Sequence, residues 1–332
     1  MTVLILSHDD VHAALAPDEC ERAMASVLAA RARGAAYNPL RSTMVPSGAS
    51  GFMGLMPAYG SGGEDANGEP AAAVFALKAL CLMPGNPARG LDTHQGTVTL
   101  FDGETGRPTA ILDASAITGI RTAAVTAVAT RTLARDDARV LAILGAGVQA
   151  RAHLAALAAV RAWEDVRLYA PTAEHARALA GADDRLRITS TAREAVNGAD
   201  VVVTATSSRE PVFEHAWLAA GAHVDAVGAS SPNAREIPVE TVAAAALYCD
   251  SRESVRHEAG EFRLAMQQGA ISGEEHIRAE LGEVLAGSAP GRGDAGELTL
   301  FRSLGIGVED LAAARVAVEQ AHRRGVGTQV EL

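Results

Sequence analysis

A single lysine is the first residue in this chain whose type and setting suggest chemistry. Of the 29 basic residues among 332, 28 are arginine and only Lys78 is lysine. Lys78 lies in a nearly continuous apolar stretch, residues 71–82. A lysine ammonium can titrate there, whereas a guanidinium keeps its proton. We therefore expect Lys78 to handle a proton, with a lysine extended along a strand or helix edge as the structural alternative.

Two arginines could complete a substrate site around this lysine. Arg41 lies in an irregular Pro- and Gly-rich segment, and Arg121 lies in the first turns of a predicted helix. A planar guanidinium suits a carboxylate, and nearby cations would lower the pKa of Lys78 toward neutrality. Spacing alone does not bring the three residues together. From the residues alone, a surface or ion-pair role is the favoured interpretation of each arginine.

A glycine-rich turn in residues 140–150 predicts a site for a dinucleotide. The apolar run 140–144 is typical of a buried parallel strand, and a helical pattern follows the turn. Gly145 permits a tight turn, Gly147 lets the backbone approach a pyrophosphate, and Ala150 lets helix and strand pack closely. The alternative is a turn between two core elements. The cofactor-binding residues predicted from this motif are Gly145, Gly147, Val148, Gln149 and Ala150.

The residues after the second predicted strand of this domain, 166–169, favour NADP over NAD. An acidic residue at that strand end usually binds the ribose 2′-hydroxyl of NAD. Asp165 lies at the other end of the strand, and the sequence continues as Ala170-Pro171-Thr172. Thr172 offers a hydroxyl to a 2′-phosphate, with Arg177 nearby. We expect NADP, with NAD as a possible cofactor.

A polar loop containing Thr206 and Ser207 follows the fourth predicted strand, 201–204. Ligands bind at the carboxyl ends of strands in doubly wound sheets, so both residues are candidates for cofactor binding. A loop that caps a helix is the alternative.

The order of predicted elements indicates an α/β protein with two domains. Strand and helix patterns alternate from residue 139 to about 250, as in a Rossmann-type doubly wound parallel sheet. The N-terminal part combines a helix, 17–33, with strands and a hairpin, and Gly- and Ser-rich turns are expected over 47–68. Residues 251–286 are predicted to be mostly helical. We expect residues 1–120 with 308–332 to form an α+β substrate-binding and dimerisation domain, and residues 121–307 to form the dinucleotide-binding domain.

Composition limits the partners. A net charge of −11 argues against nucleic acid and against an anionic membrane surface, because both need a basic patch. No apolar run approaches the roughly 20 residues that span a bilayer, and the N-terminus lacks the features of a secretory leader. We expect a cytoplasmic protein. The three cysteines are too scattered for a disulfide framework or a metal-ligand pair, and we predict no metal site.

In order along nearly the whole chain, several segments resemble the ornithine cyclodeaminase/mu-crystallin family. The segments are Gly54-Leu55-Met56-Pro57, Lys78 itself, Thr93-His94-Gln95-Gly96, Thr118-Gly119-Ile120-Arg121-Thr122-Ala123-Ala124, residues 145–150, residues 205–208, residues 221–230 and residues 304–311. Their collinear order is far more specific than the glycine turn alone.

The resemblance implies a homodimer and a nicotinamide cofactor, and it assigns roles to further residues. It implies that Arg41, Lys78 and Arg121 bind the substrate carboxylate and handle its proton. The nicotinamide is expected beside Val227, Gly228 and Ala229. Further substrate contacts are expected at Met56, His94, Ser230 and Gly305.

Two departures from the cyclodeaminases bear on the reaction. At the position of Ser230 those enzymes have an aspartate that assists ring closure, and at the position of Gly54 they have a glutamate that contacts the substrate amine. The resemblance is therefore closer to the mu-crystallin-like ketimine reductases. We expect NAD(P)H-dependent reduction of a small carboxylate-bearing imine, or the reverse oxidation of an amino acid. The alternatives are a cyclodeaminase-like lyase using bound NAD and a non-catalytic, NADP-regulated binding protein.

Overall fold

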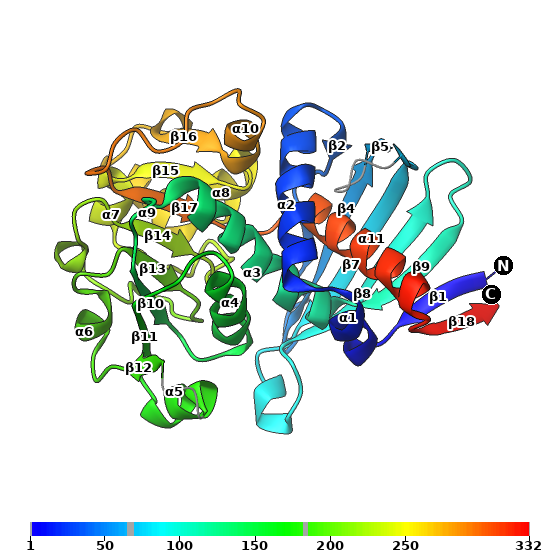
Figure 1. Ribbon diagram of the computed structural model, residues 1–332, viewed down its shortest axis with the longest axis horizontal. Helices are drawn as coiled ribbons and strands as arrows, with labels where there is room; N and C mark the ends of the chain where they lie inside the picture. The colour runs from blue at the N-terminus through cyan, green and yellow to red at the C-terminus, as the bar shows by residue number, and fades with distance from the viewer. Residues whose placement is uncertain (1, 65–69, 182–184, 332) are drawn as a thin grey trace. The chain divides into compact units, whose positions relative to one another are not determined.

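The computed structural model describes residues 2–64, 70–181 and 185–331, which fold into two compact units (Figure 1). The N-terminal unit comprises Met1–Ala124 and Gly305–Leu332, and the central unit comprises Val125–Leu304. The sequence predicts the corresponding boundaries at 120/121 and 307/308. Each unit has its own sheet and is described separately.

The N-terminal unit is built on an eight-stranded mixed sheet in the order β18-β1-β9-β8-β7-β4-β2, with β3 paired to β4. Its strands are β1 (Thr2–Leu6), β2 (Ala36–Tyr37), β3 (Ser42–Met44), β4 (Phe52–Gly60), β7 (Val74–Leu82), β8 (His94–Asp102), β9 (Pro108–Asp113) and β18 (Thr328–Glu331). A small two-stranded sheet consists of β5 (Gly63–Glu64) and β6 (Pro70–Ala71). The β8–β9 hairpin forms around the turn at residues 102–106, as predicted.

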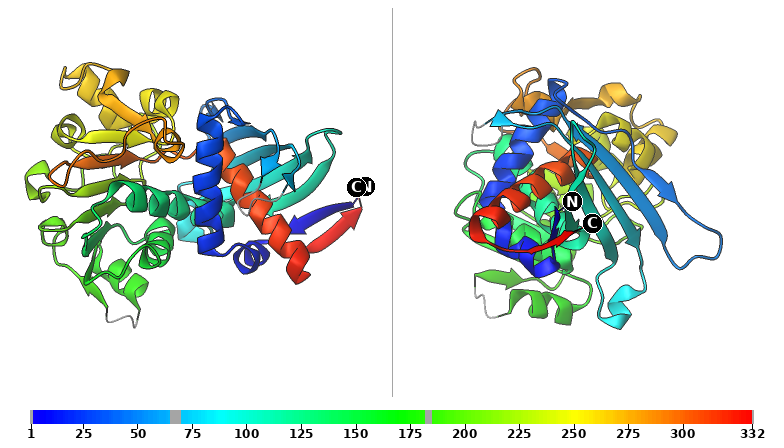
Figure 2. Two further views of the ribbon diagram at one scale, coloured as in Figure 1. Left: turned by 45° about the horizontal axis from the view of Figure 1, so that its top comes forward. Right: turned by 90° about the vertical axis from the view of Figure 1, so that its right-hand side faces the viewer.

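Three helices of this unit cover one face of its sheet: α1 (His8–Ala14), α2 (Pro17–Ala32) and α11 (Gly307–Arg324) (Figure 2). Side chains alternate along the strands, so one set of positions on β4 and β7 is buried beneath α11. A short 3-10 helix, η1 (Asn86–Arg89), lies between β7 and β8. The helix-covered face therefore contains Lys78, and α11 is the element packed above it.

The structure corrects the expected turns of residues 47–68. The whole of β4, a nine-residue strand paired with β7, lies in that stretch, and residues 65–69 lie outside the described residues. The glycines of this segment favoured a prediction of turns over a prediction of a strand. In the structure these glycines are part of the packed strand: Gly60 lies beneath Leu311, and Gly54 is buried. The sequence patterns also gave no indication of α1 and β18.

The central unit has an eight-stranded, fully parallel sheet in the order β12-β11-β10-β13-β14-β17-β15-β16. Its strands are β10 (Val140–Leu144), β11 (Asp165–Tyr169), β12 (Leu186–Ile188), β13 (Val201–Thr204), β14 (His223–Ala226), β15 (Ala246–Cys249), β16 (Ile277–Glu280) and β17 (Thr299–Arg302). Its helices are the end of α3 (Ala114–Leu133), α4 (Val148–Ala158), α5 (Ala173–Ala180), α6 (Ala192–Val196), α7 (Val239–Ala244), α8 (Arg252–Glu258), α9 (Gly260–Gln267) and α10 (Leu281–Leu285), with 3-10 turns η2 (His215–Trp217) and η3 (Glu274–His276). This is the predicted α/β fold with a doubly wound parallel sheet.

Two strands of this sheet were not expected. β16 interrupts the stretch 251–286 that the sequence indicated as mostly helical, and β17 lies between β14 and β15. β17 is four residues long and wholly buried, so its short apolar run could not be distinguished from loop by periodicity. The strand after β14 in the chain is thus not its neighbour in the sheet.

None of the helices in the described ranges is long and apolar enough to cross a bilayer. Within the same ranges, no three His, Cys, Asp or Glu side chains are grouped in a way that could hold a metal ion.

Candidate functional site

Lys78 lies near the middle of β7, with 1% of its side chain exposed. The neighbouring strands place Met56 and Val98 opposite it. Its Nζ donates to Asp310 Oδ1 at 2.8 Å and to Thr118 Oγ1 at 3.4 Å. A lysine buried among apolar side chains requires an anionic partner, and Asp310 is that partner.

Two adjacent carboxylates, Glu309 and Asp310, project from the first turn of α11 and bind Arg121. Arg121 Nε lies 3.0 Å from Asp310 Oδ1, and Arg121 Nη1 lies 2.9 Å from Glu309 Oε2. All three side chains are at most 5% exposed. Acidic residues are favoured at a helix N-terminus because they complement its dipole. The same Oδ1 atom of Asp310 therefore accepts from Lys78 and from Arg121.

The pKa values in this cluster follow from burial and charge. Burial lowers the pKa of Lys78 to about 8; Asp310 opposes this shift, while Arg121 and Arg41 add to it. Burial by itself would raise the pKa of Asp310, but Lys78 and Arg121 outweigh it and hold that pKa below its usual value. Lys78 is thus poised to exchange a proton near neutral pH, and Asp310 stays ionised beside it.

Arg41, His94 and Gly305 lie around the same cluster. Arg41 is half-buried, and its Nη2 donates to the carbonyl of Gly305 at 2.8 Å. Gly305 has a φ of 77°, and a Cβ there would lie 2.6 Å from the Arg121 guanidinium, so only glycine fits. Burial, with Lys78 and Arg121, lowers the pKa of His94 to about 4, so its ring is neutral at pH 7.

The predicted substrate residues of the N-terminal unit are therefore together. Arg41, Lys78, His94 and Arg121 interact through their charges, and Met56 is paired with Lys78 across β4 and β7. Gly54 is buried on the same side of β4 as Met56, and a Cβ at Gly54 would meet nothing within 4 Å. Because Gly54 stands where the cyclodeaminases have a glutamate, there is open space at this position instead of a side chain. Ser230 belongs to the central unit and is exposed in the loop after β14.

In the central unit, the chain turns from β10 into α4 at the predicted glycines. Gly145 has a φ of 125°, and a Cβ there would lie 2.3 Å from the Ala205 carbonyl oxygen. Gly147 is the N-cap of α4 and is exposed; a Cβ at this position would meet nothing within 4 Å, and Ala150 is buried against the sheet. A helix N-terminus with open space before it and backbone N–H groups directed outward fits a pyrophosphate.

Val148 and Gln149 form the first turn of α4, and Val148 is 58% exposed. Such exposure of a large apolar side chain fits a surface that a planar cofactor could cover. At the end of β11 the described chain continues as buried Ala170 and exposed Thr172, the N-cap of α5. Asp165 is at the opposite, amino end of β11, where it forms ion pairs with Arg167 and Arg187. It is therefore not at the strand end that leads to Thr172.

A buried carboxylate that sequence reasoning missed joins the two loops at the carboxyl ends of β13 and β14. Glu236 accepts from the backbone N–H of Thr206 at 2.6 Å, of Gly228 at 2.7 Å and of Ala229 at 3.0 Å. A Cβ on Gly228 would lie 2.1 Å from the Thr206 carbonyl oxygen. Glu236 therefore fixes Thr206 relative to the predicted nicotinamide edge, residues 227–229, while Ser207 next to it is exposed.

The comparisons with known proteins agree with this architecture. Residues 1–325 match the model of the ornithine cyclodeaminase/mu-crystallin family. The chain belongs to this family. It is 39% identical over 287 residues to the ketimine reductase mu-crystallin of Mus musculus, covering 86% of each protein. The resemblance inferred from the ordered motifs is thereby confirmed.

Two solved structures are similar over all or nearly all of this chain. One is the Δ1-pyrroline-2-carboxylate reductase of Thermococcus litoralis in complex with NADH and L-proline, 35% identical, with a TM-score of 0.91 and coverage of 99% of this chain and 100% of that one. The other is an archaeal alanine dehydrogenase dimer with bound NAD, 33% identical, with a TM-score of 0.91 and coverage of 100% of both.

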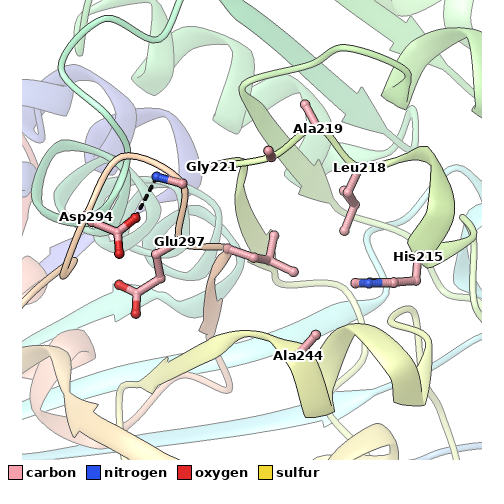
Figure 3. A pocket seen from close by; sticks show the side chains of 10 residues that line it. His215, Leu218, Ala219, Gly221, Ala244, Asp294 and Glu297 are labelled. Atoms are coloured by element: carbon pink, nitrogen blue, oxygen red, sulfur yellow. Dashed lines mark hydrogen bonds between the residues drawn. The ribbon is translucent and has the colours of Figure 1, made fainter.

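The central unit also has a hollow of about 750 Å³, which is separate from the predicted cofactor site of this unit (Figure 3). Its lining includes Gly221, Ala244 and Leu298, which precede β14, β15 and β17. It is therefore at the amino ends of the strands, whereas dinucleotides bind at the carboxyl ends in this fold. Its acids are engaged: Asp294 accepts from the backbone N–H of Gly296, and Glu297 pairs with Arg278. We assign it no part in the family's chemistry.

Glu309 and Asp310 were within a family segment but were not predicted as site residues. Two adjacent acids at the start of an amphipathic helix usually complement the helix dipole, so the sequence gave no reason to expect that they also pair with Lys78 and Arg121. The available signal was charge balance. A lysine in an apolar strand needs a buried acid, and few acids in the sequence lie in a strongly apolar context.

Proposed function

We propose that this protein is an NAD(P)H-dependent reductase of a small imine that carries a carboxylate, and that it oxidises the corresponding amino acid in reverse. The observation that carries the proposal is the buried cluster of Lys78, Asp310 and Arg121, in which one lysine can exchange a proton near neutral pH. A binding protein has no need for such a titratable donor. The reductases and dehydrogenases among the relatives support the same class of reaction.

Different residues of the N-terminal unit would bind the substrate carboxylate and transfer the proton. Arg41 and Arg121 supply cationic, planar groups for the carboxylate, which orients the imine. Lys78 holds a proton at Nζ and gives it to the substrate nitrogen as that nitrogen gains electron density. Asp310 keeps Lys78 protonated and turned toward α11. In reverse, neutral Lys78 accepts the proton from the amine.

The central unit would hold the cofactor, which supplies a hydride when bound. Gly145, Gly147 and the first turn of α4 would bind its pyrophosphate, and Glu236 would hold the loops at 206 and 228 in place for the nicotinamide end. The absence of an acid after β11 and the presence of Thr172 support NADP. Isothermal titration should then give tighter binding of NADPH than of NADH, and equal or reversed affinities would contradict this preference.

The cyclodeaminase alternative is disfavoured by two positions. Ser230 replaces the aspartate that the family's cyclodeaminases use for ring closure, and Gly54 replaces their glutamate. Open space beside Gly54 is suited to an apolar or cyclic substrate portion, not to recognition of a second amine.

A homodimer is part of the proposal. The face of the N-terminal sheet that lies opposite α11 exposes large apolar side chains: Tyr37, Met44, Leu55 and Phe75 are 64%, 57%, 36% and 48% exposed. Such a patch usually marks an interface, and the related alanine dehydrogenase is described as a dimer. Light scattering should report a dimer, and Leu55→Asp with Phe75→Asp should give monomers that retain their secondary structure.

A screen of imines and amino acids for turnover with NADPH or NADP tests the reaction itself. We expect cyclic 2-carboxy imines, or 2-oxo acids with ammonia, to be reduced with one cofactor oxidised per product. Ammonia release from ornithine without net cofactor consumption would instead identify a cyclodeaminase. Ligand binding without any turnover would identify a binding protein.

A further inference from the structure

One guanidinium of the central unit is almost completely buried and binds a single turn of the chain. Arg302 is the last residue of β17, and 2% of its side chain is exposed. Its Nη1 donates to the carbonyl oxygens of Ala226 at 2.9 Å and of Ser303 at 3.0 Å, and its Nη2 donates to the carbonyl oxygen of Ala229. Ala226 and Ala229 are the two ends of the turn after β14, which contains the predicted nicotinamide edge, residues 227–229.

Glu261 balances the charge of this guanidinium. It lies in the first turn of α9, is 2% exposed, and forms an ion pair with Nε of Arg302. A buried guanidinium without an anion would be strongly unfavourable. The preceding residue, Gly260, has no room for a side chain, because a Cβ there would lie 2.3 Å from the carbonyl oxygen of Ala234. The start of α9 is therefore packed tightly against the chain that follows β14, and Glu261 holds Arg302 there.

Arg302 and Glu236 bind the same turn through its two kinds of backbone group. Glu236 accepts from the N–H groups of Gly228 and Ala229, whereas Arg302 donates to the carbonyl oxygens of Ala226 and Ala229. Ala229 thus has its N–H bound by a carboxylate and its C=O bound by a guanidinium. The two charges also act on each other: burial raises the pKa of Glu236, and the charge of Arg302 is among the influences that oppose this rise.

We infer that Arg302, compensated by Glu261, is a positioning residue that fixes the turn after β14 for the nicotinamide end of the cofactor. The inference rests on the proposed function and adds a residue to its cofactor site. A planar guanidinium presents several donors in a rigid fork and can bridge two carbonyl groups, whereas an ammonium is a point charge on a flexible chain. A turn that is fixed before the ring arrives lowers the cost of ordering it on binding, and hydride transfer depends steeply on the position of the ring. In this role Arg302 acts through the backbone at 226 and 229 and not through contact with the cofactor.

The test separates the nicotinamide end of the cofactor from the rest. NADPH and 2′-phospho-ADP-ribose differ by the nicotinamide ring, so the ratio of their dissociation constants reports on the ring. Calorimetry should show the wild type binding NADPH at least about tenfold more tightly than the fragment, and this advantage should fall to about twofold or less in Arg302→Met. If NADH binds more tightly than NADPH, NADH and ADP-ribose take their places.

A merely structural role predicts another outcome. Loss of packing alone would weaken the binding of NADPH and of the fragment equally, so their ratio would not change. An advantage that is absent from the wild type, or unchanged in folded Arg302→Met, would overturn the inference.

Arg292→Met is the matched control. Arg292 is half-buried and binds near the amino end of the same strand: its Nε donates to the carbonyl oxygen of Leu133 at 2.7 Å, and its Nη2 donates to Thr299 Oγ1 at 2.8 Å. Its replacement should lower the melting temperature and leave the advantage of NADPH over the fragment at the wild-type value. An equal loss of this advantage in both variants would assign the effect to general destabilisation and would contradict the inference.

Arg302→Lys decides the matter if Arg302→Met does not fold. The lysine keeps a positive charge beside Glu261 but gives up the fork that bridges the two carbonyl groups, so the advantage of NADPH should still fall by at least about threefold. Full retention of the advantage in this variant would mean that the charge suffices, and it would remove the positioning role from the guanidinium.

Failure of the proposed function gives a different result, because the binding ratio does not depend on turnover. If no imine is reduced but the advantage is lost in Arg302→Met and kept in Arg292→Met, the reductase assignment fails and the positioning role stands. If imines are reduced and the advantage is unchanged in Arg302→Met, only the positioning role fails. If the wild type binds neither NADPH nor NADH, both fail.

Discussion

Replacing Asp310 by asparagine should move the pH dependence of the reaction to lower pH. In the proposed reaction Lys78 acts in its protonated form during imine reduction, so kcat/KM is expected to fall as pH rises through the pKa of about 8. Asp310 is the group that raises this pKa against burial and both arginines. Asp310→Asn removes the opposing charge, keeps the shape, and leaves only influences that lower the pKa.

The size of the shift follows from the ion pair. Two unit charges 2.8 Å apart interact by about 6 kcal/mol at an effective dielectric constant of about 20. At about 1.4 kcal/mol per pH unit this corresponds to an upper limit of about four units. Local rearrangement and water entry reduce it, and we expect the alkaline limb to move by at least about two units.

The assay measures kcat/KM for imine reduction from about pH 5 to about pH 9, and the rate is monitored through the oxidation of NADPH. In Asp310→Asn, activity should be low at neutral pH and recover in acid. Recovery distinguishes a shifted pKa from a damaged site. Thr118→Val, which removes only the 3.4 Å contact, should keep the limb near its wild-type position. An alkaline limb that stays in place in folded Asp310→Asn would refute the assigned role of this pair.

Other predictions address the lysine, the cofactor and stability. Lys78→Met should lower kcat by roughly two to four orders of magnitude with NADPH binding retained, and Lys78→Arg should be nearly as poor; an active Lys78→Arg enzyme contradicts proton transfer by this residue. Ala170→Asp should shift preference toward NADH by repelling the 2′-phosphate, measurable by titration calorimetry; unchanged preference would place the selectivity elsewhere. Glu236→Gln should weaken NADPH binding, detected by nucleotide fluorescence, more than it changes the melting temperature, because its two carboxylate oxygens hold three loop N–H groups. His94 has a folded pKa of about 4 against 6.5 for a free histidine, so the unfolded chain binds more protons between these values and stability should fall as pH is lowered from about 6.5 to about 4; His94→Asn should flatten that fall in thermal melts, and an unchanged slope would assign it to other groups.

The parallel sheet of the central unit could be predicted because its signals are local. The apolar run 140–144, the glycines that follow it and the helical pattern after them each lie within a few residues. The structure adds that Gly145 needs its positive φ and approaches the Ala205 carbonyl too closely for any side chain. β17 escaped prediction because four buried residues contain no periodicity, and its place between β14 and β15 depends on pairing across a long separation in sequence.

The sequence by itself determined the family, the fold class and the chemical types of the candidate site, because ordered motifs and one isolated lysine are properties of the chain as written. It could not pair Lys78 with Asp310, which lies 232 positions later, nor show that Arg121 shares the same carboxylate oxygen. Only the packing of α11 over the sheet of the N-terminal unit brings these charges together. The tertiary structure thus decided the pKa of Lys78 and the charge balance of the site, since both depend on burial and on distances of about 3 Å that no local sequence pattern encodes.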